Sequence, residues 1–126
     1  MPNFLLRTIV VSFVIFAVSF GAEAAQPFNA QAFQAAQTAG KTILIDVTAS
    51  WCPTCRQQKP IIQAVEKEMP SLVVYEVDFD AAKDVLRRFR VQAQSTLIVF
   101  KGEKEVGRST GDTDPTRIRD LVAKGF

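Results

Sequence analysis

The sequence predicts an α/β fold, a three-layer sandwich in which helices flank a four-stranded mixed sheet. Two observations predict it. Apolar, β-rich runs alternate along the chain with segments of helical periodicity, an order typical of parallel strands joined by helices. Near the end of the chain, two such runs are separated only by a short glycine-containing turn, which adds an antiparallel hairpin at one edge of the sheet. The expected order of elements is α-β-α-β-α-β-β-α.

The first helix and the first strand are expected over residues 30–39 and 42–47. Asn29 is a suitable N-cap for the helix, and Gly40 can end it in the left-handed conformation that glycine tolerates. The strand reads TILIDV, which is nearly all apolar and predicts burial on both faces of the sheet. Asp46 is the exception, because a buried carboxylate costs free energy unless it is paired or protonated.

The second helix is expected to begin at Cys52, because Pro53 then occupies the first helical position, where proline is favoured. Residues 72–79 alternate in a way that predicts the second strand. Asp80 is expected to cap a third helix that extends to residue 89.

The third strand is expected over residues 96–100, followed by a turn at 101–104 and a fourth strand over 105–110. Asp114 and Pro115 open the last helix as its N-cap and its first helical residue. This hairpin and helix complete the expected sandwich.

Composition excludes several classes of function. The chain of 126 residues carries 15 Lys and Arg against 13 Asp and Glu, a net charge of +2 with no basic stripe for nucleic acid. It contains no histidine, which removes Ser-His-Asp and Cys-His catalysis and His-ligated zinc. Its two cysteines cannot complete a four-cysteine zinc site within one chain.

Residues 1–24 are expected to be a secretory signal peptide, and residues 25–126 the folded domain. Arg7 precedes the apolar run 9–20, and a site of the Ala-x-Ala type ends at Ala24, where cleavage is expected. An uncleaved membrane anchor is the alternative, although twelve helical residues reach about 18 Å against a hydrocarbon core of about 30 Å. The leader predicts export, to a bacterial periplasm, where disulfides persist.

The segment Cys52–Cys55, a C-x-x-C pair that follows a strand and opens a helix, carries the chemistry. A thiolate at a helix N-terminus is stabilised by the helix dipole and by free N–H groups. Cys52 is nearest the terminus and is expected to be the more exposed thiol, so it would attack a substrate disulfide, and Cys55 would resolve the mixed disulfide. The alternative is a static structural disulfide, but so short a loop gives little stabilisation.

Asp46 lies six residues before Cys52 in the expected strand. The functional interpretation is a buried proton acceptor for Cys55. The alternative is an aspartate near the strand end that points to solvent, as surface aspartates commonly do.

Residues 28–126 resemble the thioredoxin family. The matching features are Asp46, Trp51, the Cys52–Cys55 pair, the helix-kinking Pro60, the strand–turn–strand 96–110 with Gly102 in its turn, and Gly111. The resemblance implies a thiol-disulfide oxidoreductase with Cys52 as nucleophile, Cys55 as resolving thiol and Asp46 assisting proton transfer.

The resemblance also implies a substrate groove, which would be formed by Trp51, Pro53, Thr54, Ser95 and Thr96. The family has a cis-proline immediately before the residue that matches Thr96, and this chain has Ser95 there. Because a cis bond before a non-proline residue costs about 2.5–4 kcal/mol, we expect a trans Gln94–Ser95 bond.

Two further departures concern the sheet. Glu76 stands where the family often has a lysine near the buried aspartate, and facing acids would raise the pKa of Asp46. Only Gln26, Pro27 and Phe28 precede the first helix and its Asn29 cap as a possible strand, so the first strand of the family is expected to be reduced or absent.

The expected function is therefore thiol-disulfide exchange with protein thiols and disulfides in an extracytoplasmic compartment, by a monomer that a membrane redox partner recharges. No cofactor is expected beyond the redox-active disulfide Cys52–Cys55, and no metal or nucleic acid. Two alternatives stay open: a metal- or cluster-binding dimer that uses the cysteine pairs of two chains, and a non-catalytic interaction module that kept the fold. Reduction of insulin disulfides separates catalysis from the interaction module, and metal analysis tests the dimer.

Overall fold

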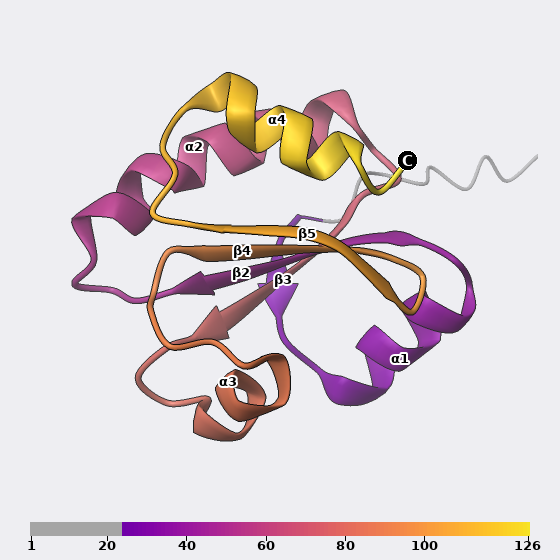
Figure 1. Cartoon of the computed structure of the whole chain (residues 1–126), viewed down its shortest axis with the longest axis horizontal. Coiled ribbons are helices and arrows are strands. Elements are labelled where there is room, and N and C mark those ends of the chain that lie inside the picture. The colour runs from indigo at the N-terminus through magenta and orange to yellow at the C-terminus, as the bar shows by residue number, and fades with distance from the viewer. Residues whose placement is uncertain (1–23) are drawn as a thin grey trace, which may run out of the picture.

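The computed structural model describes residues 24–126, a three-layer α/β sandwich in which a five-stranded mixed sheet lies between two pairs of helices (Figure 1). Residues 1–23, most of the expected leader, lie outside this range. Within it, no helix is both long enough and apolar enough to cross a lipid bilayer. The elements in chain order are β1 (Gln26–Pro27), α1 (Ala30–Thr38), β2 (Thr42–Thr48), α2 (Pro53–Glu68), β3 (Val73–Asp78), α3 (Lys83–Phe89), β4 (Thr96–Lys101), β5 (Lys104–Thr110) and α4 (Pro115–Ala123).

The strands are ordered β1-β3-β2-β4-β5. The pairs β1–β3 and β2–β3 are parallel, whereas β2–β4 and β4–β5 are antiparallel. The expected fold class is confirmed. The first strand is reduced to Gln26 and Pro27, which pair with Tyr75 and Glu76 and bring the sheet to five strands. A proline is tolerated there because β1 is an edge strand.

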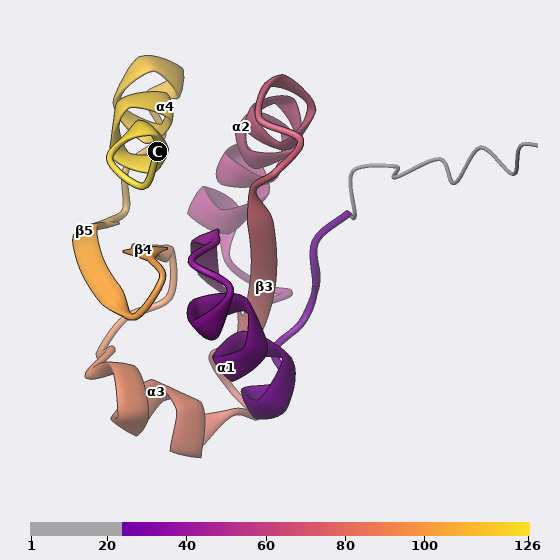
Figure 2. The same ribbon diagram turned by 90° about the vertical axis from the view of Figure 1, so that its right-hand side faces the viewer.

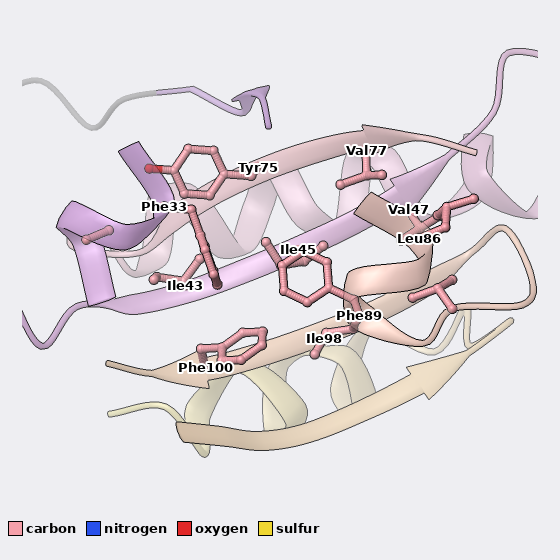
Figure 3. Packing of buried hydrophobic residues seen from close by; sticks show 12 residues of the cluster. Phe33, Ile43, Ile45, Val47, Tyr75, Val77, Leu86, Phe89, Ile98 and Phe100 are labelled. Atoms are coloured by element: carbon pink, nitrogen blue, oxygen red, sulfur yellow. The ribbon is translucent and has the colours of Figure 1, made fainter. Parts of the chain in front are cut away.

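Helices α1 and α3 cover one face of the sheet, and α2 and α4 cover the other (Figure 2). The first face is aromatic: the ring of Phe33 lies 5.4–6.2 Å from the rings of its four neighbours, Phe28, Tyr75, Phe89 and Phe100. Figure 3 shows Phe33 with Tyr75, Phe89 and Phe100. Most of these rings meet edge to face, the arrangement that their quadrupoles favour. The other face is aliphatic, and α4 packs there through Ile118, Leu121 and Val122, as expected.

Strand β2 is buried on both faces, as its apolar sequence predicts. Ile43, Ile45 and Val47 point to the aromatic face, and Leu44 points to the aliphatic face. Since side chains alternate along a strand, Asp46 shares the side of Leu44, which is the side of α2. The strand therefore carries a carboxyl group beneath the helix that begins with the cysteine pair.

Three of the four helix starts match the expectations. Asn29 and Asp114 each accept the capping hydrogen bond of their helices, and Cys52 is the N-cap of α2. The expected cap at Asp80 is wrong. The carboxylate of Asp78 accepts the backbone N–H groups of residues 80 and 81 instead, and this turn delays α3 until Lys83.

Candidate active site

The cysteine pair lies just after the end of β2, at the N-terminus of α2. Cys52 and Cys55 form a disulfide with their Cα atoms 5.3 Å apart. Cys52 has extended backbone angles, φ −87° and ψ 111°, and Pro53 starts the helix directly after it. Proline suits this position because the missing N–H would have no partner in the helix and its fixed φ is helical. The sequence therefore places one sulfur at the helix terminus and the other one turn along.

The two sulfurs differ in their surroundings. The Sγ of Cys52 accepts the backbone N–H of Cys55 at 3.1 Å, so it caps the positive end of α2. The expectation that Cys52 is the more exposed thiol is wrong: Cys52 is 1% exposed and Cys55 is 5% exposed. The asymmetry of the pair is electrostatic, because the loops that pack over the helix start cover both residues.

Ser95 lies against both sulfurs. Its Oγ is 3.2 Å from the Sγ of Cys52 and 3.1 Å from that of Cys55. None of the peptide bonds described from residue 24 onward is cis, which confirms the expected trans Gln94–Ser95 bond. Ser95 instead adopts φ +61°, a left-handed conformation that is uncommon outside glycine.

Gln58 is a residue of the site that sequence reasoning missed. It is 1% exposed, and its Nε2 donates to the backbone carbonyls of Ser95 at 3.2 Å and Asp112 at 2.8 Å. It therefore ties α2 to the two loops that flank β4 and β5. The signal was present: Cys52, Cys55 and Gln58 follow one another at intervals of three, so they share one helix face.

Of the other expected groove residues, Trp51, Pro53 and Thr54 lie beside the cysteine pair. Thr96 is buried. Trp51 is 54% exposed, and its indole N–H donates to the carboxylate of Asp80 at 2.7 Å. Pro53 is exposed and Thr54 is half-buried. The hydroxyl of Thr96 is turned to the protein, where it donates to a backbone carbonyl at 2.8 Å.

Asp46 is buried rather than turned to solvent, with 7% of its surface exposed. Burial raises its pKa from 3.8 to about 7, and the negative charges of Glu76 and Glu66 add to the rise. Glu76 is its register partner on β3, as the sequence suggested. The ammonium of Lys59 on α2 acts in the opposite direction and favours the carboxylate.

Two clefts flank this region of α2. One, of about 620 Å³, is lined by Cys55, Lys59 and Glu76 among others. The second, of about 340 Å³, is lined by Asp46, Glu66 and again by Lys59 and Glu76. Lys59 and Glu76 therefore lie between the surroundings of Cys55 and the carboxyl group of Asp46.

The N-terminal end of the described chain also reaches the smaller cleft. Ala24 and Ala25 line it, and the backbone N–H of Ala25 donates a hydrogen bond to the carboxylate of Glu66. Burial raises the pKa of Glu66 above its ordinary value, and this hydrogen bond partly offsets the rise. In residues 24–126, the acidic and cysteine side chains form no group of three or more that could hold a metal ion.

Comparison with known proteins finds a family that matches almost all of the described residues. The family profile named Thioredoxin matches residues 24–124. A thioredoxin H-type from Fagopyrum esculentum is 39% identical over 79 residues, which is 63% of this chain and 68% of that protein. A thioredoxin from Chlamydia trachomatis is 35% identical over 82 residues, 65% of this chain and 80% of its own.

A solved structure agrees with these sequences. The crystal structure of Trxlp from Edwardsiella tarda is 38% identical and superimposes with a TM-score of 0.76, covering 79% of this chain and 98% of Trxlp. The similarity thus extends over the cysteine pair, the sheet and all four helices.

Proposed function

Since this chain belongs to the thioredoxin family and is a thiol-disulfide oxidoreductase, we propose that it exchanges disulfides with protein substrates in an extracytoplasmic compartment. The observation that carries the activity is the Cys52–Cys55 disulfide at the N-terminus of α2, where the Sγ of Cys52 accepts the backbone N–H of Cys55 and caps the helix. This placement favours the thiolate that disulfide exchange requires.

In the first step of the proposed mechanism, the thiolate of Cys52 attacks one sulfur of a substrate disulfide. A bond forms between Cys52 and that sulfur, and the substrate S–S bond breaks and releases one substrate thiolate. The support for Cys52 as the attacking thiol is its position as N-cap, where the N–H of Cys55 and the helix dipole both act on its sulfur.

In the second step, the thiolate of Cys55 attacks the Sγ of Cys52. The Cys52–Cys55 disulfide forms, the mixed disulfide breaks, and the second substrate thiolate leaves, so that the substrate gains two electrons and the protein loses two. Asp46 is the proposed acceptor of the Cys55 proton. A carboxyl group with a pKa of about 7 is a better base near neutral pH than an ordinary aspartate.

The proposed substrate groove consists of Trp51, Pro53, Thr54, Ser95 and Thr96. Trp51 is its best-supported member, because an indole that is 54% exposed next to the nucleophile offers a flat apolar contact for a peptide. Because both sulfurs are nearly covered, the groove has to open for a substrate disulfide to reach Cys52.

The proposed location rests on the leader. Residues 1–24 have the charge, the apolar run and the small-residue site of a secretory signal, with cleavage after Ala24 and the periplasm as destination. In that compartment a membrane redox partner would recharge the protein, which we propose acts as a monomer. Fractionation of cells that express the full chain, with sequencing of the exported N-terminus, tests this: a chain starting at Ala25 is expected, and a full-length cytoplasmic chain would contradict it.

Reduction of insulin disulfides tests the activity. The protein with dithiothreitol as electron source is expected to precipitate the insulin B chain faster than dithiothreitol alone. The matched control is the double variant Cys52→Ser with Cys55→Ser, which has no thiol, with its fold checked by circular dichroism. A rate equal to that of the double variant would overturn the proposed activity.

A further inference from the structure

The hydroxyl of Ser95 is positioned to donate a hydrogen bond to sulfur. Its Oγ lies 3.2 Å from one sulfur of the pair and 3.1 Å from the other. Because Cys52 and Cys55 are joined in a disulfide, neither sulfur carries a proton, so the hydroxyl is the only donor that these contacts can have. A disulfide sulfur is a weak acceptor, whereas a thiolate is a charged one, so the contact strengthens when the pair is reduced.

The backbone holds this hydroxyl in place. Ser95 is 3% exposed, and its N–H donates to the carbonyl of Val47 at 2.8 Å. Its own carbonyl accepts from the N–H of Gly111 at 3.0 Å and from the side chain of Gln58 at 3.2 Å. Three segments of the chain thus fix one residue, and a fixed donor loses little entropy when charge develops beside it.

We propose that Ser95 is a catalytic residue whose hydroxyl donates to whichever sulfur carries the negative charge. It stabilises the thiolate of Cys52 before the first attack. After the mixed disulfide has formed at Cys52, the hydroxyl turns to the thiolate of Cys55, which then attacks. The hydroxyl keeps its proton throughout, so bonds and electrons balance as in the two exchange steps above, on which this inference rests.

A proline could not fill this role. It has no side-chain donor, its φ is fixed near −65° rather than +61°, and it lacks the N–H that Ser95 gives to Val47. The conformation and hydrogen bonds of the loop before β4 therefore suit a serine at position 95 and not a proline. This chain has a chemical group at the sulfurs that the cis-proline of the family does not supply.

Two clefts hold the other charged groups near the sulfurs. Arg56 and Lys59 from α2 and Glu76 and Asp78 from β3 line the larger cleft, and the carboxyl group of Asp46 lines the smaller one. None of them is a hydrogen-bond partner of Ser95, so variants of Ser95 leave this background unchanged. A change in thiolate formation in such variants then reports on the hydroxyl.

The test compares the parent with Ser95→Ala and Ser95→Gly. Both variants remove the hydroxyl and keep the backbone N–H, and glycine adopts a positive φ without strain. Threonine is not a useful replacement, because a β-branched residue is strained at this φ. Ser109→Ala is the matched control: it removes a hydroxyl that is buried in β5 and has no hydrogen-bond partner among the described residues.

The main measurement is the rate of alkylation of the reduced protein by iodoacetamide as a function of pH. In both Ser95 variants the midpoint of thiolate formation is expected to rise by about one pH unit, a tenfold loss of thiolate at a given pH, since the thiolate loses a hydrogen bond to its charge. Above both midpoints, the equilibrium with a reference dithiol should shift by about tenfold toward the disulfide, which is about 30 mV more reducing. Ser109→Ala should match the parent in both measurements.

Alkylation midpoints of Ser95→Ala and Ser95→Gly that equal the parent midpoint would overturn the inference. So would a change that appears in the denaturant midpoint alone, because a merely structural serine affects stability and not thiolate formation. The readout does not depend on turnover. A protein that fails to reduce insulin but shows the shifted midpoints would overturn the proposed activity and leave only the stabilisation of the thiolate by Ser95.

Discussion

The two cysteine side chains are chemically unequal, and this inequality can be tested one residue at a time. Cys52→Ser should reduce disulfide exchange to the background rate, because it removes the sulfur that caps α2. Cys55→Ser should instead accumulate a mixed disulfide with substrate, because the first attack remains possible and the second does not. Non-reducing gels and mass spectrometry of the adducts distinguish these outcomes. Equal loss in both variants with no trapped adduct would contradict the assignment.

Asp46 makes stability depend on pH in a defined direction. Its pKa is about 7 in the folded protein and ordinary, 3.8, when unfolded, so the folded state holds a proton that the unfolded state releases between these values. The contribution of Asp46 to the free energy of unfolding therefore falls as the pH rises from about 4 to about 7, and the whole of this loss is reached above pH 7. At 1.36 kcal/mol per pH unit, the cost is about 4 kcal/mol.

Asp46→Asn removes this cost with little change in shape. The variant should match the parent near pH 4 and exceed it by about 2–4 kcal/mol above pH 7 in urea unfolding. Asp84→Asn is the control, since Asp84 lies exposed on α3 with its side chain 92% accessible. A parent that is as stable as the variant at every pH would mean that contacts in the folded protein already offset the free-energy cost of burying the Asp46 carboxylate.

The same substitution should slow the resolving step. An amide cannot accept the proton of Cys55, so turnover of Asp46→Asn should fall most below pH 8, where Cys55 depends on a base, and recover as the pH rises. The measurement is the rate of insulin reduction against pH for parent, Asp46→Asn and Asp84→Asn. Parent-like rates at every pH would show that Asp46 has no part in proton transfer.

At the scale of elements, the face of α2 that carries the pair also positions the loop of Ser95. Gln58→Ala should destabilise the protein by about 2–4 kcal/mol, because it opens a cavity, removes the side-chain donor of the Asp112 carbonyl and leaves the Ser95 carbonyl with the N–H of Gly111 alone. The exposed neighbour Gln57→Ala should leave stability within about 0.5 kcal/mol of the parent. Denaturant unfolding of the three proteins checks this, and a Gln58→Ala variant as stable as Gln57→Ala would contradict it.

The elements themselves could be predicted because their signals are local. Strand β2 is recognised by its apolar run, and α2 and α4 by a proline at the first helical position. The start of α3 could not be predicted in the same way. Asp80 is a suitable cap by residue type, but its carboxylate accepts the indole N–H of Trp51, which is 29 residues away in sequence, and α3 begins after Ala82 without a side-chain cap.

Over the whole molecule, the sequence predicted the fold, the cysteine pair and Ser95 as a groove residue, but not the contact of the Ser95 hydroxyl with both sulfurs. The contact of Ser95 with Cys52 spans 43 residues and depends on how β4 lies against β2. The exposure of the sulfurs was predicted wrongly for the same reason: it is set by the packing of loops, whereas helix capping is set by neighbours in the chain. The chemistry of the cysteine pair could therefore be predicted from its local sequence, whereas the packing of the loops around the sulfurs could be seen only in the structure.

The contact between Ala25 and Glu66 has a consequence for maturation. The smaller cleft holds the carboxyl groups of Asp46, Glu66 and Glu76 with the single ammonium of Lys59. Cleavage after Ala24 would convert the N–H that faces Glu66 into an α-ammonium and add a second cation to this cleft.

Removal of the leader would then also stabilise the fold, because the new α-ammonium of Ala25 would form an ion pair with the carboxylate of Glu66. A chain that begins at Ala25 should be more stable at pH 7 than the same chain with an acetylated N-terminus, and Glu66→Gln should abolish that difference. The advantage should disappear as the pH rises above about 8 and the amine loses its proton, and as the pH falls and the carboxylates gain theirs. The uncleaved chain would thus hold three carboxyl groups against one ammonium in this cleft, and cleavage would add the second cation.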